Sequence, residues 1–166
     1  MRNRFLLSLL AASLLVTSPA MASDDTAEVF VLHGISGGSL GLADFGFPVD
    51  VYIGGVGCAI ENFRFTDIVG PVALPGGDYE IKIFPRTPGL PGCSGDAALA
   101  ATVSVMNGRS YDLVAHLDGN GGPTLSAFRN VDPAARVAES TVTVRHTAWA
   151  PEVGVLARRG GETTVV

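Results

Sequence analysis

Short runs of alternating apolar and polar residues recur along most of the chain, and glycine, proline or asparagine ends nearly every run. The clearest run is YEIKIF at 79–84, where Tyr79, Ile81 and Ile83 share one side of an extended backbone. Alternation with a period of two residues predicts a β-strand, and the glycine- and proline-rich stretches between the runs predict turns. The pattern therefore predicts an all-β chain of about ten short strands without a long helix.

The expected strands cover 28–33, 49–53, 59–66, 71–74, 79–84, 97–105, 110–117, 123–130, 141–146, 152–157 and 163–166. Asn107-Gly108 separates two of them and predicts a hairpin. The run 59–66 offers Ile60, Phe63 and Phe65 to the core, and its broken alternation near Glu61-Asn62 indicates a β-bulge. Apolar residues on both faces of 28–33 indicate a strand covered on both sides. Residues 131–140 fit either a linker or a single helical turn. The spacing is typical of a sandwich or a barrel.

The first 22 residues form a complete secretory signal, with Arg2 and Arg4, an apolar run over 5–16 and an Ala20-Met21-Ala22 cleavage site. We expect cleavage after Ala22 and a periplasmic or secreted chain without a membrane span. Residues 23–27 are then a flexible lead-in, and 28–166 form one β-sandwich domain. Cleavage leaves 9 of the 11 basic side chains and all 16 acidic ones. A net charge of −7 disfavours nucleic acid as a partner.

Cys58 and Cys93 are the two cysteines of the chain. In an oxidising compartment an even pair is expected to form one disulfide. The alternative is a pair of metal ligands, although no second cysteine or histidine stands at the spacing of a zinc site. The disulfide and the long loops favour the sandwich over the barrel.

Two stretches, 28–55 and 141–166, echo each other. Each has a β-rich run closed by a histidine (His33, His146), a loop that ends in proline (Pro48, Pro151), a second β-rich run and a Gly-Gly turn. The loop 34–47 is ten residues longer than its counterpart, 147–150. Ordered loops of that length are often functional. The segment 141–166 either begins a second unit or completes the first.

These motifs resemble the family called domain of unknown function 4397. Its members carry a histidine, a proline-terminated loop and a Val-Asp-Val strand, as at His33 and 48–51 here; LPGGDY at 74–79 and NGRSY at 107–111 are similar to its later turns. The resemblance covers 28–166 and implies an exported, immunoglobulin-like antiparallel β-sandwich with Greek-key-type connections, often repeated. It implies no activity. Gly154 replaces the motif aspartate in the echo, so that Asp50 alone retains it.

Candidate chemistry is sparse. His33, Asp50 and His146 are the candidate centre of a metal-dependent hydrolase, but both histidines also suit caps that hydrogen-bond their loops, and His116 is expected to decorate an edge. DGNG at 118–121 is similar to part of a calcium loop and equally fits a hairpin turn. The Gly-x-Ser-x-Gly spacing occurs at 34–38 and at 37–41, but no helix is expected after this glycine-rich stretch, and both a nucleophile elbow and an anion-binding loop require one. We expect no enzyme activity, no catalytic or metal-binding residues and no cofactor.

The remaining candidate is a surface. Phe45, Phe47 and Trp149 lie in or beside the two equivalent loops and would meet at one end of the sandwich if the repeat is real; the alternative is that all three fill the core. We expect an exported, non-enzymatic module with a structural or interaction role in the cell envelope. The alternative function is a small-ligand or glycan-binding protein, with Phe45, Phe47, Asp50 and Trp149 as ligand-binding residues. An envelope protein or a glycan is the expected partner, and the oligomeric state stays open.

Overall fold

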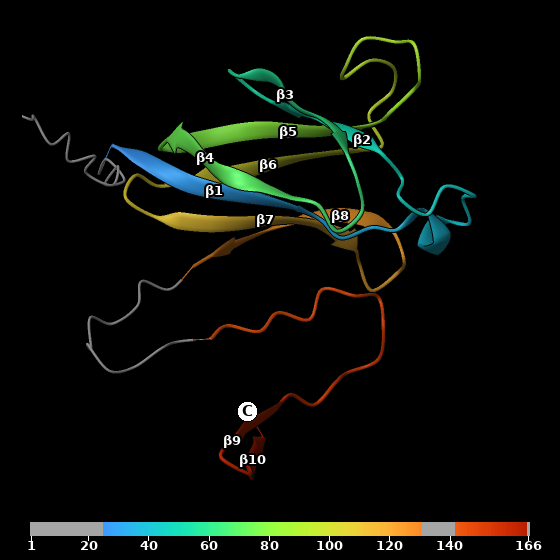
Figure 1. Cartoon of the computed structure of the whole chain (residues 1–166). Coiled ribbons are helices and arrows are strands. Elements are labelled where there is room, and N and C mark those ends of the chain that lie inside the picture. Colours follow the sequence, from blue (N-terminus) through green and yellow to red (C-terminus); the bar gives the residue numbers. More distant parts are fainter. Residues whose placement is uncertain (1–24, 131–141, 166) are drawn as a thin grey trace, which may run out of the picture.

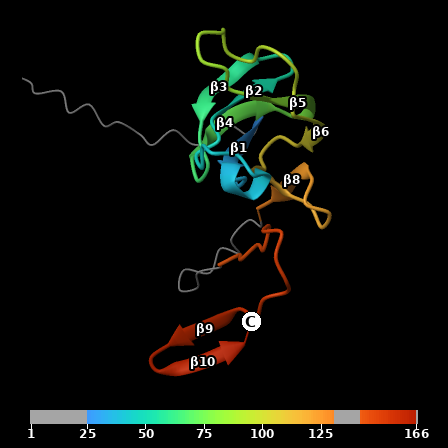
Figure 2. The same cartoon turned by 90° about the vertical axis from the view of Figure 1, so that its right-hand side faces the viewer.

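The computed structural model of the chain describes residues 25–130 and 142–165. They form two four-stranded sheets packed face to face and a separate two-stranded hairpin (Figures 1 and 2). Sheet A has the order β4 (Ile68–Pro75), β1 (Thr26–His33), β7 (Ser110–Leu117) and β8 (Pro123–Arg129). Sheet B has the order β3 (Gly57–Phe63), β2 (Val49–Ile53), β5 (Gly77–Pro85) and β6 (Leu99–Val105). The predicted all-β sandwich is confirmed.

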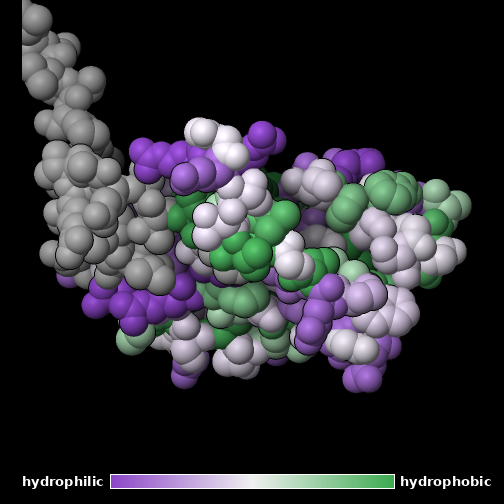
Figure 3. Space-filling view, turned by 90° about the horizontal axis from the view of Figure 1, so that it is seen from below, coloured by the Kyte–Doolittle hydropathy of each residue, from purple (hydrophilic) through white to green (hydrophobic). Residues whose placement is uncertain are grey.

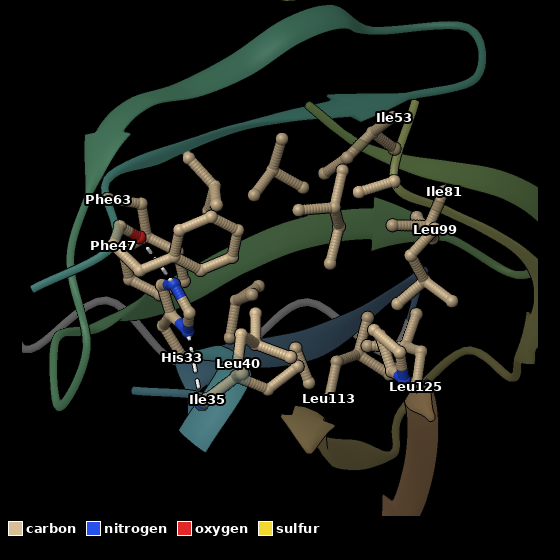
Figure 4. Close-up of a pocket in the computed structure, with 17 residues that line it drawn as sticks. His33, Ile35, Leu40, Phe47, Ile53, Phe63, Ile81, Leu99, Leu113 and Leu125 are labelled. Atoms are coloured by element: carbon tan, nitrogen blue, oxygen red, sulfur yellow. Dashed lines mark hydrogen bonds between the residues drawn. The ribbon is translucent and has the colours of Figure 1, made fainter. Parts of the chain in front are cut away.

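The core lies between the two sheets because alternate residues of their strands point inward. In β1 every second residue is buried, from Ala27 through Val29 and Val31 to His33. Sheet B supplies the facing layer from its own inward positions, which include Val51, Ile53, Ile81 and Val103. Burial of these side chains is the main favourable contribution to folding. A small apolar cavity of about 60 Å³ remains between the sheets (Figure 4).

The predicted hairpin around Asn107-Gly108 is wrong. Strand β6 pairs with β5 in sheet B, whereas β7 pairs with β1 and β8 in sheet A, so the turn is a corner between the sheets. The Gly108 N–H donates to the Thr26 carbonyl at 2.9 Å and ties this corner to the start of β1. An Asn-Gly pair specifies a tight turn, but it does not decide whether the two strands that follow share a sheet.

Most strand pairs are antiparallel, as predicted, but β1 and β7 run parallel. The bulge expected near Glu61-Asn62 is confirmed. Two steps along β2, from Val49 to Val51, correspond to three along β3, from Phe63 to Ile60. Asn62 takes a positive φ of 54° within this bulge. The expected strand 59–66 ends at Phe63, so that Phe65 belongs to the following turn.

The C-terminal arm, which we define as residues 142–165, joins neither sheet. The expected strands 141–146 and 152–157 do not form over 142–155; instead β9 (Leu156–Arg159) and β10 (Glu162–Val165) pair around Gly160-Gly161. The start of the arm lies along the outer face of sheet A. The surface seen from the side of the arm carries apolar residues near its middle, among hydrophilic ones (Figure 3). The linker or helical turn expected over 131–140 lies outside the described residues, and no helix within them has the length and apolar character to cross a membrane.

Candidate functional site

The loop 34–47 is folded by its own hydrogen bonds. A 3₁₀ turn, Gly37–Leu40, is capped by Ser36, whose hydroxyl accepts from the Ser39 N–H at 3.1 Å. The Gly37 N–H donates to the Phe45 carbonyl at 3.0 Å, which brings the two ends of the loop together. A Cβ on Gly37 would stand 1.8 Å from the Asp44 carbonyl oxygen, so only glycine permits this close approach. The insertion is therefore an ordered loop.

Phe45 and Phe47 leave this loop in different directions. Phe47 packs against the core, which is what the core-filling alternative predicts. Phe45 is 62% exposed and contacts Phe65 edge to face, with ring centroids 5.4 Å apart. The Phe65 N–H donates to the Gly46 carbonyl at 2.8 Å, which fixes the turn after β3 against the loop. The exposed Phe45 and the half-buried Phe65 thus form one aromatic pair.

Trp149, in the C-terminal arm, lies against the turn 118–122. It is 59% exposed, and a Cβ on Gly121 would stand 3.3 Å from three of its ring carbons. That turn is rigid because Asp118 Oδ1 accepts from the Asn120 and Gly122 N–H groups at 2.8 and 2.9 Å. These donors lower the pKa of Asp118. These hydrogen bonds fit the hairpin-turn alternative for DGNG, and the turn lies against Trp149.

A surface cleft of about 220 Å³ joins the loop to the arm, and we call it the aromatic cleft. Phe65 and Trp149 line it together with Ser36, Ser39 and Thr147. A second cleft of about 220 Å³ continues on the other side of Trp149, beside His116, Asp118 and His146. Phe45 and Trp149 thus lie at the same end of the sandwich with Phe65 between them, although the strands of the second copy do not form over 142–155. Sequence reasoning missed Phe65 because it placed this residue in the core.

Asp50 lies elsewhere, on the outer face of sheet B, where it is 2% exposed. Its two oxygens accept from Arg86 Nη1, each at 3.0 Å, and from the N–H groups of Asn62 at 2.9 Å and Cys93 at 3.2 Å. Arg86 also reaches Glu61 at 2.8 Å, and this pairing helps to raise the pKa of the Arg86 guanidinium. Asp50 therefore holds three backbone segments together, and it does not line the aromatic cleft.

The predicted disulfide between Cys58 and Cys93 is confirmed, with Cα atoms 5.7 Å apart. It links the start of β3 to the loop that follows β5. The Cys93 N–H bond to Asp50 lies beside this bridge. The disulfide and the Asp50 group together hold the loop 86–98 against sheet B. The metal-ligand alternative for the two cysteines does not apply.

His33 is a core residue. Its Nε2 lies 2.9 Å from the Phe47 carbonyl oxygen and its Nδ1 accepts from the Ile35 N–H at 3.3 Å, as Figure 4 shows. Both nitrogens are thus engaged. Burial lowers the pKa of His33, so the neutral ring is favoured. The histidine closes the loop 34–47, which agrees with the predicted capping role.

The other two histidines lie on different elements. His146 is exposed and its Nε2 is 3.2 Å from the Pro151 carbonyl oxygen, while Asp50 faces away from the core that holds His33. No group of three candidate ligands comes together within 25–130 and 142–165, so the proposed centre of His33, Asp50 and His146 does not form. His116 lies on β7, an inner strand rather than an edge, and bonds Ser126 at 2.8 Å.

Comparison with known proteins gives one family. A search of curated proteins finds no significant match. The family model of the domain of unknown function DUF4397 matches residues 27–156, which span both sheets and most of the arm up to the start of β9. This match covers more than half of the chain and includes the histidine loop, the Asp50 strand and the aromatic cleft. The chain therefore belongs to the DUF4397 family of domains of unknown function.

Proposed function

We propose that this chain is an exported, non-enzymatic interaction module of the cell envelope that binds a partner through the aromatic cleft. The observation that carries the proposal is a group of aromatic rings at one end of the sandwich, the exposed Phe45 and Trp149 and the half-buried Phe65. Aromatic side chains provide large contact areas at a low cost in conformational entropy, and they are enriched where proteins bind partners. A rigid loop and a rigid turn hold these rings in place.

Export and the absence of catalysis rest on the sequence. The signal over 1–22 supports a periplasmic or secreted location. Asp50 is the carboxylate of the family motif, and its bonds to Arg86, Asn62 and Cys93 support a structural role for it. The net negative charge of the exported chain supports a partner other than nucleic acid.

The test is binding of the purified protein to envelope fractions of the source organism. Trp149→Ala combined with Phe45→Ala is expected to reduce retention on these fractions at least tenfold, as expected when central aromatic residues are lost from an interface. Leu90→Ala, which removes a 48% exposed apolar side chain from another loop, is the matched control and should bind like the wild type. Equal binding of the double variant and the control would contradict the proposal.

A glycan is the second candidate partner, and a specific observation favours it. The cleft combines the Trp149 ring with the hydroxyl groups of Ser36, Ser39 and Thr147. Sugars present apolar ring faces that stack on aromatic rings and hydroxyl groups that exchange hydrogen bonds with side chains. Trp149 is the only tryptophan of the chain, so its fluorescence reports on the cleft alone. Titration with soluble envelope glycans should change this fluorescence if a glycan is the partner, and protein-only fractions should do so if it is not.

A further inference from the structure

The outer face of sheet A carries a binding site for an arginine side chain. Arg145 Nη1 donates to Asp112 Oδ2 at 2.8 Å, and Nη2 donates to Asn130 Oδ1 at 2.9 Å. The guanidinium carbon also lies 5.0 Å from the centre of the Phe128 ring. A carboxylate, an amide oxygen and an aromatic face are the groups that recognise a planar cation. We call Asp112, Phe128 and Asn130 the arginine clamp.

The strands of sheet A hold this clamp in position independently of Arg145. Asn130 Nδ2 donates to Asp112 Oδ1 at 3.0 Å and to Ser110 Oγ at 3.2 Å. The Asn130 N–H donates to the Ser110 carbonyl at 2.8 Å. All members stand on β7, on β8 or directly after β8, and these strands pair along their full length. The clamp is therefore pre-organised to receive a guanidinium group from any segment that can reach it.

The arm seats Arg145 in the clamp but leaves its own apolar residues uncovered. Thr143, Arg145 and Thr147 face the sheet, while Val142 is 82% exposed and Val144 61% exposed. Beneath the arm remains a groove of about 430 Å³, and its walls are Phe30, Leu32, Ile68 and Val114. Ile68 is 67% exposed at the edge of this groove. When the arm docks on the sheet of its own chain, apolar surface therefore stays exposed both on the arm and in the groove of the sheet.

The distribution of exposed apolar side chains points to the arm as an interface. The arm contains 24 of the 130 residues that the structure describes, yet it holds half of the twelve large apolar residues that are exposed among them. These six are Val142, Val144, Trp149, Val153, Leu156 and Val165. Every residue of β9 and β10 is exposed, and a two-stranded hairpin is marginally stable in water without further contacts.

Charge favours a second copy of this chain as the partner. Residues 25–130 carry 5 basic and 11 acidic side chains, a net charge of −6, whereas the arm carries 3 basic and 2 acidic ones, a net charge of +1. Two sandwich bodies therefore repel each other, but the arm of one copy is attracted to the body of the other. Eleven residues connect Asn130 to the arm, and a chain of that length can span up to roughly 36–40 Å.

We propose that two copies of this chain exchange their arms, so that Arg145 of each copy occupies the arginine clamp of the other. A reciprocal exchange repeats the contacts seen within one chain and closes on itself under twofold symmetry. It also brings the exposed apolar residues of the two arms, one set from each copy, into one assembly. In the exchanged pair Trp149 completes the aromatic cleft of the other copy. The inference does not depend on what that cleft binds.

The first test is sedimentation of the purified protein over a range of concentrations. We expect a dimer for the wild type, and a dissociation constant that rises at least tenfold in Arg145→Ala and in Asp112→Ala, since each change removes charged hydrogen bonds. Lys82→Ala removes a cation from sheet B and is the matched control; its dimer should be unchanged. A wild type that stays monomeric up to about 1 mM would show that each arm docks on its own body and would overturn the proposal.

A mixing experiment separates exchange from other dimers. In a mixture of the two variants, the arm of Asp112→Ala retains Arg145 and the body of Arg145→Ala retains the clamp. One clamp of a mixed pair can therefore close, whereas neither variant can close a clamp with itself. We expect the mixed dimer to be at least tenfold tighter than either variant alone. Dimers of equal strength in the mixture and in the separate variants would overturn the exchange.

Discussion

Asp50 offers the sharpest test of how the sandwich is held together, because one buried carboxylate joins three segments. It accepts hydrogen bonds from the guanidinium of Arg86, from Asn62 in the bulge of β3 and from Cys93 in the loop after β5. Replacement by alanine leaves two backbone N–H groups without their acceptor and leaves Arg86 with Glu61 alone. The polar loss is concentrated at one site that is 2% exposed.

The magnitude follows from these bonds. Each of the two N–H groups left without an acceptor costs roughly 1–2 kcal/mol, and the hydrogen bonds from Arg86 are lost as well. Asp50→Ala should therefore lower the free energy of unfolding by about 3 kcal/mol. Asp50→Asn keeps one acceptor oxygen and loses the charge, so about 2 kcal/mol is expected.

The assay is urea unfolding followed by circular dichroism, with the disulfide intact. Asp44→Ala is the matched control, because Asp44 is an exposed carboxylate with a single backbone bond, to the Gly46 N–H at 2.9 Å. Its cost should stay below about 1 kcal/mol. If Asp50→Ala lowered the free energy of unfolding no more than Asp44→Ala does, the Asp50 carboxylate would not hold the three segments together as its hydrogen bonds indicate.

The remaining predictions concern the disulfide, His33 and the turn below Trp149. Cys58→Ser with Cys93→Ser should cost about 4 kcal/mol in urea unfolding, the value of the chain-entropy model for a separation of 35 residues, and a loss below about 1 kcal/mol would contradict it. Burial lowers the pKa of His33, so that as the pH falls the unfolded chain takes up a proton on this histidine before the folded chain does. The free energy of unfolding should therefore be unaffected by His33 above about pH 6.5 and should decrease as the pH drops below that value. The melting temperature of the wild type should therefore decrease more between pH 7 and pH 5 than that of His33→Asn, and parallel pH profiles would refute this. Gly121→Val should displace Trp149 and shift its fluorescence emission, whereas Gly89→Val, at a similar positive φ but where a Cβ meets no atom within 4 Å, should leave the spectrum unchanged.

The strands could be predicted because their information is local. Alternation in YEIKIF places Ile81 and Ile83 inside, and both are buried in β5. The interruption of alternation at Glu61-Asn62 likewise marks a real bulge. Pairing between distant strands is not local information. Asn107-Gly108 specifies a tight turn equally well at a hairpin and at a corner between sheets, so the assignment of β6 and β7 to one sheet was wrong.

The candidate site was predictable only in part, for a related reason. Phe45 and Trp149 do lie at one end of the sandwich, but the second copy of the expected repeat forms no strands over 142–155, so a structural repeat is not what brings them together. Phe65 was missed because the alternation of 59–66 continues past the point where β3 ends. Asp50 and Arg86 are 36 residues apart, and no spacing in the sequence predicts that the bulge and the disulfide loop aim their N–H groups at the same carboxylate.

The two histidine loops show which features the local sequence determines and which depend on distant strands. His33 bonds the Phe47 carbonyl just before Pro48, and His146 bonds the Pro151 carbonyl, so each histidine closes its own loop. Yet β1 pairs with β4 and β7 and buries His33, whereas residues 142–145 join no sheet and His146 is exposed. The motif therefore encodes the closure of a loop, and the neighbouring strands decide whether its flanks become a sheet. An extended segment with a closed loop but without strand partners retains unpaired backbone and uncovered valines. Among the described residues, 142–147 therefore combine the features that binding of a second polypeptide as an added strand uses.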